Sequence, residues 1–184
     1  MKRTVHGLTI ECVKGDITDQ GDMQAVVNAA NAELKTGGGV AGAIHKAAGP
    51  ALEKACEPLA PIEPSEAVVT EGFDLPNDYV IHCLGPVYGV NRPEDLLLRK
   101  CYDNVLDVAE EKGIESLAVP ALSTGAFRYP VDEAADVAIK AVGDKACSLS
   151  NVKHVRFVLY DDPALSHHEK ALDRYLKNAR KEDV

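Results

Sequence analysis

The chain has 184 residues, of which 46% are hydrophobic and 27% are charged, the ordinary mix of one soluble globular domain with a substantial core. Its 29 Asp and Glu residues exceed its 20 Lys and Arg, and a net charge of −9 argues against nucleic acid as the main partner, because duplex binding needs a basic face. No apolar run approaches the roughly 20 residues of a membrane span, and the stretch MKRTVHGLTIEC lacks the apolar core of a signal peptide, so we expect a cytoplasmic protein with no membrane attachment.

Short apolar runs typical of buried β-strands alternate with helical segments along the chain. Several of these runs are almost continuously hydrophobic, as expected for strands that are covered on both faces. The predicted strands are, in order, residues 8–13, 25–30, 66–72, 79–85, 116–122 and 154–160. Strands mixed with helices in this order predict an α/β fold, a three-layer α/β/α sandwich in which residues 1–184 form one domain.

Helices are predicted between and after these strands. Their ranges are 39–48, 50 to about 59, 93–113, from 130 onward and from 162 onward. Pro93 and Pro130 open two of them, and Asp162 is expected to cap the last, with Pro163 at its first position. The final residues KNARKEDV are expected to form an exposed helix end and a short polar tail from about residue 178.

The five cysteines are scattered along the chain. None forms a C-x-x-C pair, and no Cys/His grouping has the spacing of a zinc site, so we expect buried thiols and no bound metal. Of the histidines, His82 lies in a predicted strand and is expected inside the protein, whereas His167 and His168 are expected at solvated helix positions.

Three consecutive glycines, Gly37, Gly38 and Gly39, directly precede a predicted helix. Gly37, Gly39 and Gly42 also match the G-x-G-x-x-G dinucleotide motif, but the segment NAELKT separates them from the strand that this motif requires. The outer spacing is that of a phosphate-binding P-loop, yet Ala43 occupies the position of its lysine. A glycine run that enters a helix exposes free N–H groups at the positive end of the helix dipole, which predicts an anion site. A flexible loop is the alternative.

A second loop supports an anion site. The segment PALSTGAFRYP, residues 120–130, follows an apolar strand and precedes a helix. In folds of this kind ligands lie beyond the carboxyl ends of the strands, so both loops are expected at one edge of the sheet. Four small residues in the second loop allow a phosphate to touch the backbone: Ser123, Thr124, Gly125 and Ala126. The two loops together could hold a diphosphate.

The spaced motifs G-D-I-T at 15–18, A-x-V-N-A-A-N at 25–31, G-G-G-V at 37–40, I-H-x-A-A-G at 44–49 and P-A-L-S-T-G-x-F at 120–127 resemble those of the macrodomain family. The resemblance covers the chain from end to end. It implies a central mixed sheet and an ADP-ribose cleft, with ADP-ribose and ADP-ribosylated proteins as partners and no cofactor.

The resemblance also implies the role of each site residue. Asp16 would accept a hydrogen bond from the adenine amino group beside the Ile17 backbone, and Tyr160 would flank the base. Asn31 would bind the distal ribose and Phe127 would close over it, while Asn28 would brace the loop. Backbone of Gly37, Gly38, Gly39 and Val40 would contact one phosphate, and residues 123–126 the other.

One departure from the family pattern bears on catalysis. Hydrolases of the MacroD type carry an aspartate after G-G-G-V, where this chain has Ala41. The resemblance therefore implies either hydrolysis of ADP-ribosyl esters on acidic side chains without that carboxylate, or a module that binds ADP-ribose without chemistry. Deacetylation of O-acetyl-ADP-ribose and dephosphorylation of ADP-ribose 1″-phosphate would use the same pocket.

The expected catalytic set is Asn31, Gly39, Phe127 and His45. His45 lies one helical turn beyond Ala41, where it could support the site, and a capping or packing role near the helix end is the alternative. An unrelated nucleotide ligand remains a third class of function. Nothing in the sequence indicates an exposed apolar repeat, so a monomer is expected.

Overall fold

The computed structural model describes residues 1–182 as a single sheet with helices on both of its faces. The strands are β1 (Lys2–Val5), β2 (Leu8–Lys14), β3 (Ala25–Ala29), β4 (Ala67–Glu71), β5 (Tyr79–Cys83), β6 (Ser116–Val119) and β7 (His154–Leu159). The helices are α1 (Gly39–Ala48), α2 (Pro50–Cys56), α3 (Glu94–Glu111), α4 (Val131–Lys145) and α5 (Asp162–Glu182), with short 3₁₀ turns at Glu57–Leu59 and Ala146–Ser148. None of the helices within this range is long and apolar enough to cross a bilayer.

The sheet is mixed, with strand order β1-β2-β7-β6-β3-β5-β4. The five inner strands are parallel to one another, and the edge strands β1 and β4 each run antiparallel to their neighbour. Parallel strands need crossover connections, which the helices provide. One result is that the last strand in the sequence, β7, lies between β2 and β6 near the middle of the sheet.

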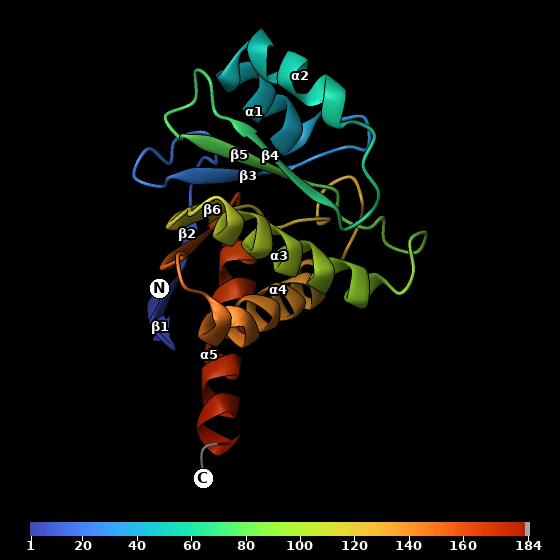
Figure 1. The fold of residues 1–184 in the computed structure, drawn as a ribbon. Helices are drawn as coiled ribbons and strands as arrows, with labels where there is room; N and C mark the ends of the chain where they lie inside the picture. Colours follow the sequence, from blue (N-terminus) through green and yellow to red (C-terminus); the bar gives the residue numbers. More distant parts are fainter. Residues whose placement is uncertain (183–184) are drawn as a thin grey trace.

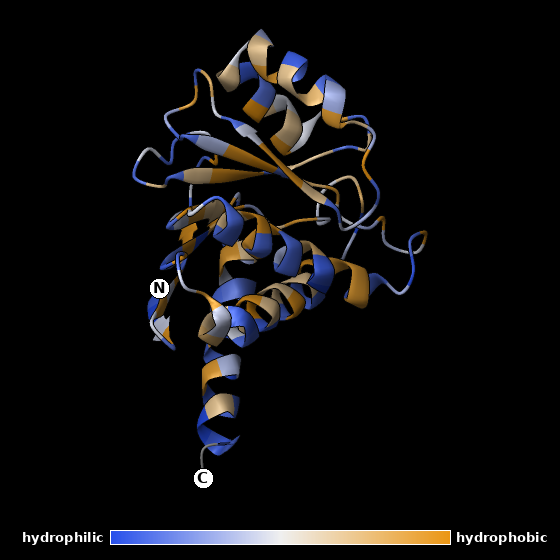
Figure 2. Ribbon diagram, viewed as in Figure 1, coloured by the Kyte–Doolittle hydropathy of each residue, from blue (hydrophilic) through white to orange (hydrophobic). Residues whose placement is uncertain are grey.

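Two apolar clusters hold the three layers together. Helices α3, α4 and α5 cover one face through a large cluster that includes Leu106, Ile139 and Leu172, and α1 and α2 cover the other through Ile44 and Leu52. Figure 1 shows these two helical layers on opposite sides of the sheet. Strands β3 and β5 run largely through hydrophobic residues, while α3 and α5 carry both hydrophobic and hydrophilic positions (Figure 2). The α/β/α sandwich that the sequence predicts is confirmed.

Every predicted strand is present, although the run 120–122 belongs to the following loop. Strand β1 was not predicted. Three of its four residues are exposed and only Val5 is buried, so the sequence shows no hydrophobic alternation there. Its pairing with β2 depends on the turn at His6 and Gly7, which have φ of 47° and 83°. Positive φ at both turn positions is typical of a tight hairpin, and the His-Gly pair is the signal that could have revealed it.

The expected cap of α5 was Asp162, and the structure shows a different one. Asp161, not Asp162, caps the helix, because its Oδ1 accepts a hydrogen bond from the Ala164 amide at 2.9 Å. Asp162 is instead the first helical residue, where its charge favours the positive end of the helix dipole. The helix continues through Glu182, and residues 183–184 of the expected polar tail lie outside the described range.

The expectation that His168 is solvated is also wrong. It is fully buried rather than solvated, and its ring lies 5.5 Å from the ring of Phe157, centroid to centroid. Its Nδ1 lies 2.8 Å from the Ala164 carbonyl oxygen, and burial lowers its pKa. The sequence places it among polar neighbours, but the helical rotation carries it toward the sheet together with Ala171 and Leu172.

Glu110, on α3, should be a stabilising residue because its carboxylate accepts hydrogen bonds from the backbone amides of Ser150, Asn151 and Val152. These bonds fix the loop that enters β7. Replacing Glu110 with alanine should lower the free energy of unfolding by about 1–3 kcal/mol, because amides lose a charged acceptor. Urea unfolding measures this, with Glu111→Ala, an exposed neighbour, as the control. Equal stability of the two variants would contradict the expectation.

Candidate ligand-binding site at the carboxyl edge of the sheet

The loops that carry the predicted site residues meet at one edge of the sheet. Strands β2, β7, β6, β3 and β5 are parallel, so the segments that follow them leave the sheet on the same side. These segments carry Asp16 after β2, Tyr160 after β7, residues 120–130 after β6 and the glycine loop after β3. Because β3 and β6 are paired neighbours, the two predicted anion loops start next to each other. This is the edge at which α/β folds bind ligands.

The glycine loop, residues 30–38, is shaped by Asn31. The Asn31 side chain donates through Nδ2 to the Lys35 carbonyl at 2.8 Å and accepts through Oδ1 from the Lys35 amide at 3.0 Å. A side chain at Gly37 would come within 3.2 Å of the same Nδ2, so Asn31 also lies against the glycine run. Asn31 therefore braces the loop. Its amide keeps one further hydrogen and lone pair for a ligand.

The glycine run presents a row of free amides. Gly37, Gly38 and Gly39 are exposed, and Gly39 has φ of 57°, a conformation that favours glycine. Within residues 1–182, the backbone N–H groups from Gly37 to Ala41 have no hydrogen-bond partner. They stand at the first turn of α1, where the helix dipole is positive. An anion is the group that such a row of donors can satisfy.

The second loop is held in a tight conformation by its own backbone. The Tyr129 amide donates to the Ser123 carbonyl at 2.9 Å, and the Arg128 amide donates to the Gly125 carbonyl at 3.0 Å. Ser123 has φ of 67°. Thr124 is turned inward, since both its amide and its hydroxyl donate to the Ala121 carbonyl. No partner within the described residues accepts from four other amides of this loop: Ser123, Gly125, Ala126 and Phe127.

A third segment, after β5, supports this second loop and was not predicted as part of the site. Gly85 lies so close to Ser123 that an added Cβ would be 2.1 Å from the Ser123 hydroxyl. The Tyr88 amide donates to the Phe127 carbonyl at 2.8 Å. The signal was present in the sequence, because Gly85 is the last residue of the predicted strand 79–85, whose carboxyl end reaches the same edge.

Phe127 and the two ends of the site share one apolar floor. Phe127 is half-buried and packs against the cluster that contains Leu34 from the glycine loop and Ile17 from the segment after β2. Val40, at the start of α1, packs against the same cluster. The free amides of both loops are therefore fixed above a common hydrophobic base.

Asp16 lies at the far end of this edge, after β2. Its Oδ1 accepts from the Thr18 amide at 2.8 Å and from the Thr18 hydroxyl at 2.7 Å, and these hydrogen bonds lower its pKa. Among the described residues nothing pairs with Oδ2, which leaves an ionised acceptor open to a ligand. The Ile17 side chain is buried, and its backbone N–H is likewise free of partners in that range.

Tyr160 follows β7 and stands beside this segment. Its side chain is 90% exposed, so the ring is a surface aromatic rather than a core residue. The Gly15 amide donates to the Leu159 carbonyl at 3.0 Å, which ties the residue before Tyr160 to the residue before Asp16. Asp16 and Tyr160 thus follow two residues that are bonded to each other, so a carboxylate and an exposed aromatic ring, both suited to a nitrogenous base, lie at neighbouring strand ends.

A buried polar group lies beneath α1. Asn28 was expected to brace the loop, but it lies inside β3 and is fully buried. Its Nδ2 is 3.1 Å from Nδ1 of His82. Nε2 of His82 lies 2.9 Å from the Thr70 hydroxyl oxygen. Burial and the nearby His45 lower the pKa of His82 to about 3. His82 is thus the satisfied interior histidine that the sequence predicts.

His45 and Ala41 are both on the buried side of α1. The His45 ring lies 6.4 Å from the His82 ring, centroid to centroid, and burial lowers its pKa. Neither ring nitrogen of His45 has a partner within residues 1–182. Ala41 is 5% exposed and contributes only a methyl group. The start of α1 therefore offers backbone donors, with no acid or base on the Ala41 side chain, while the His45 imidazole is buried one turn further along the helix.

The edge opposite to these loops carries a hollow of about 430 Å³ between the end of β4 and the start of β5. Its lining includes Glu71, Phe73 and Asp78. None of the predicted site residues reaches it. We therefore assign it no part in the candidate site.

Comparison with known proteins agrees with this geometry. The family model described as "Macro domain" matches residues 27–138. A Macro domain-containing protein of Chlorobaculum tepidum is 43% identical over 164 residues, which cover 89% of this chain and 95% of the relative. The solved Oceanobacillus iheyensis macrodomain with ADP has a TM-score of 0.92 and 35% identity, covering 97% of both chains. The Trypanosoma brucei macrodomain in complex with ADP-ribose has a TM-score of 0.82 and 33% identity, covering 89% of this chain and 68% of that one.

Proposed function

Because the chain belongs to the macrodomain family, we propose that it binds ADP-ribose at the carboxyl edge of the sheet and releases ADP-ribose from acidic side chains of modified proteins. The observation that carries the proposal is that two loops with free amides, at residues 37–41 and at 123 and 125–127, follow the paired neighbouring strands β3 and β6. A diphosphate carries the charge that these donors need, and the molecule offers it backbone rather than basic side chains. Hydrogen bonds to a charged group are worth about 1.5–3 kcal/mol each, enough to outweigh the screened net charge.

In this proposal the residues at the two ends of the site determine where the adenine and the distal ribose bind. Adenine lies between the Asp16 carboxylate and the exposed Tyr160 ring, with the Ile17 amide beside it. The distal ribose lies over the glycine loop, between Asn31 and Phe127. This direction places the anomeric carbon near Gly39, where a protein-linked ribose can point out of the cleft.

The proposed reaction is hydrolysis of an acyl ester. Water attacks the anomeric carbon, a new carbon–oxygen bond forms, the bond to the Glu or Asp carboxylate breaks, and the water proton passes to a phosphate oxygen of the substrate. The carboxylate is a good leaving group, so orienting the water and stabilising the positive charge on the ribose can suffice. Ala41 cannot accept a proton, and His45 is buried below the helix, so in this scheme the protein acts by positioning.

The test is incubation with a glutamate-ADP-ribosylated protein, with an active hydrolase alongside. We expect free ADP-ribose to appear, and Asn31→Ala to lower the rate, because the brace of the glycine loop is lost. Calorimetry with ADP-ribose measures binding separately. Saturable binding without release would favour the second candidate, a module that reads ADP-ribose, which the alanine at position 41 supports.

A further inference from the structure

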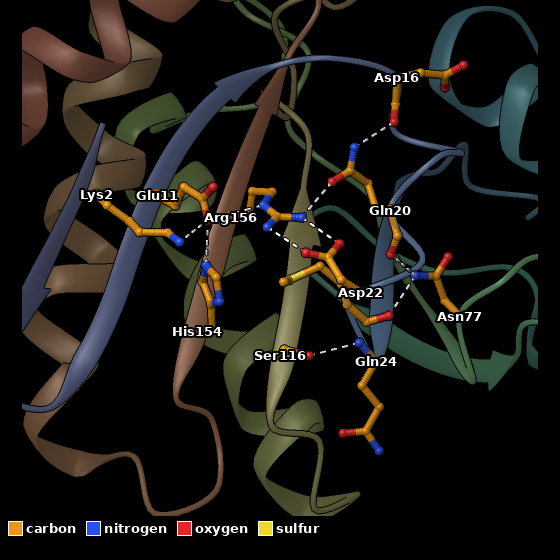
Figure 3. Close-up of polar contacts among 11 residues, drawn as sticks. Lys2, Glu11, Asp16, Gln20, Asp22, Gln24, Asn77, Ser116, His154 and Arg156 are labelled. Atoms are coloured by element: carbon orange, nitrogen blue, oxygen red, sulfur yellow. Dashed lines mark hydrogen bonds and ion pairs between the residues drawn. The ribbon is translucent and has the colours of Figure 1, made fainter.

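A polar network joins the middle of the sheet to the segment that carries Asp16. Its centre is Arg156 on β7, a side chain that is 13% exposed. Arg156 donates to both carboxylate oxygens of Asp22, at 2.7 and 2.8 Å, and through Nη1 to Oε1 of Gln20 at 3.0 Å. On its other side Nε lies 3.2 Å from Glu11, an ionic contact whose direction is not that of a hydrogen bond. Figure 3 shows the network.

Gln20 connects Arg156 to Asp16 through hydrogen bonds of its side-chain amide. Its side chain is buried, and its Nε2 donates to the Asp16 carbonyl at 2.9 Å. The Gln20 carbonyl in turn accepts from Nδ2 of the buried Asn77 at 2.8 Å, which holds its backbone. One amide thus links Arg156 to the main chain of Asp16. In Figure 3 the Asp16 carboxylate points away from Gln20, so the network holds the backbone and leaves the carboxylate open.

We propose that Gln20 and Arg156 determine base specificity by positioning Asp16 for the amino group of adenine, an inference that rests on the proposed binding of ADP-ribose. A carboxylate recognises a donor on the base edge only while its backbone is held at the right height and angle. Thr18 fixes the rotation of the carboxylate, and Gln20 fixes the peptide from which it projects. Gln20 and Arg156 are positioning residues, since neither is placed at the ligand.

The contacts of Arg156 use the branched shape of its guanidinium group. Arg156 donates two parallel hydrogen bonds to Asp22 and a third hydrogen bond to Gln20. A lysine ammonium group, with its charge on one nitrogen, cannot reproduce all three. Arg156→Lys keeps the charge beside Glu11 and Asp22 but releases Gln20. Gln20→Ala removes the link itself.

The experiment compares ADP-ribose with its analogue in which hypoxanthine replaces adenine, so that an oxygen stands where the amino group was. The unaltered protein should prefer ADP-ribose by roughly 10- to 100-fold, the value of one hydrogen bond to a charged group. Gln20→Ala and Arg156→Lys should reduce this preference to about threefold or less, by weakening ADP-ribose while the hypoxanthine analogue keeps its affinity. Arg174→Lys, which alters another arginine–aspartate pair, between Arg174 on α5 and Asp136 on α4, should keep the full preference.

Retained binding of the analogue shows that each variant is folded. Asp16→Ala should lower the preference by itself, and adding Gln20→Ala to it should change nothing further. If a variant binds both ligands equally more weakly, or keeps the full preference for ADP-ribose, the inference is overturned but the proposed function is not. Failure of both ligands to bind the unaltered protein would overturn the proposed function, and the inference with it.

Discussion

Replacing Gly42 with alanine should weaken ADP-ribose binding by on the order of 100-fold, the loss of about two hydrogen bonds to a charged phosphate. Gly42 lies in the first turn of α1, and an added Cβ would stand 2.4 Å from the carbonyl oxygen of Gly37. The obstacle is backbone, so it cannot swing aside as a side chain could. The glycine run would have to move, and its amides would leave the positions that the proposed diphosphate site requires.

The opposite change in the next residue provides the control. Ala43 is exposed, so Ala43→Gly costs about 1 kcal/mol of helix propensity without touching the loop. We expect Ala43→Gly to be less stable yet to bind with unaltered affinity, and Gly42→Ala to be folded yet to bind on the order of 100-fold more weakly. Calorimetry with ADP-ribose and urea unfolding of both variants separate the two effects. Binding by Gly42→Ala at the unaltered affinity would show that the diphosphate does not sit on this loop.

The second large effect is a loss of stability in mild acid. His82 is fully buried, and its pKa is lowered to about 3 in the folded protein, against 6.5 for a free side chain. Below the unfolded value the unfolded chain takes up a proton that the folded chain refuses, so stability falls as pH drops from about 6.5 towards 3. At pH 5 this single histidine should lower the free energy of unfolding by about 2 kcal/mol relative to pH 8. His45, whose pKa is also lowered, adds to the loss.

Urea unfolding at pH 8, 6.5 and 5 measures this dependence. His82→Gln should be less stable at pH 8, because the bonds to Asn28 and Thr70 are disturbed, but should lose less stability on acidification. The difference between the two slopes isolates the contribution of His82. Parallel slopes for the two proteins would mean that another group causes the acid sensitivity.

The amino-acid sequence allowed the fold, and the position of two glycine-containing loops at one edge of the sheet, to be predicted for a physical reason. Gly37, Gly38 and Gly39 ahead of a helix, and Ser123 to Ala126 after a strand, are local signals of exposed backbone. The parallel strands then bring these separate loops to one edge. Local pattern and sheet topology together were sufficient.

Contacts between distant residues could not be predicted in this way. Gln20 and Arg156 are 136 positions apart, and neither stands in a motif. The unexpected position of Asn28 has a similar cause, because it is bonded to His82 of β5, which follows about fifty residues later. Asn31, which braces the loop instead, is only four residues from Lys35, to which it is bonded. His168 was misjudged because its burial depends on how α5 is rotated against Phe157.

The strand order constrains when the protein can fold during synthesis. The hairpin β1-β2 joins the rest of the sheet only through β7, which is made after every other strand. A ribosome-bound chain that stops before residue 154 can pair β6, β3, β5 and β4, but its first fourteen residues have no partner strand to join. The segment that carries Asp16 is then unanchored. Such distant pairing is slow to form, so the end of the proposed site that carries Asp16 is completed only once translation is nearly finished.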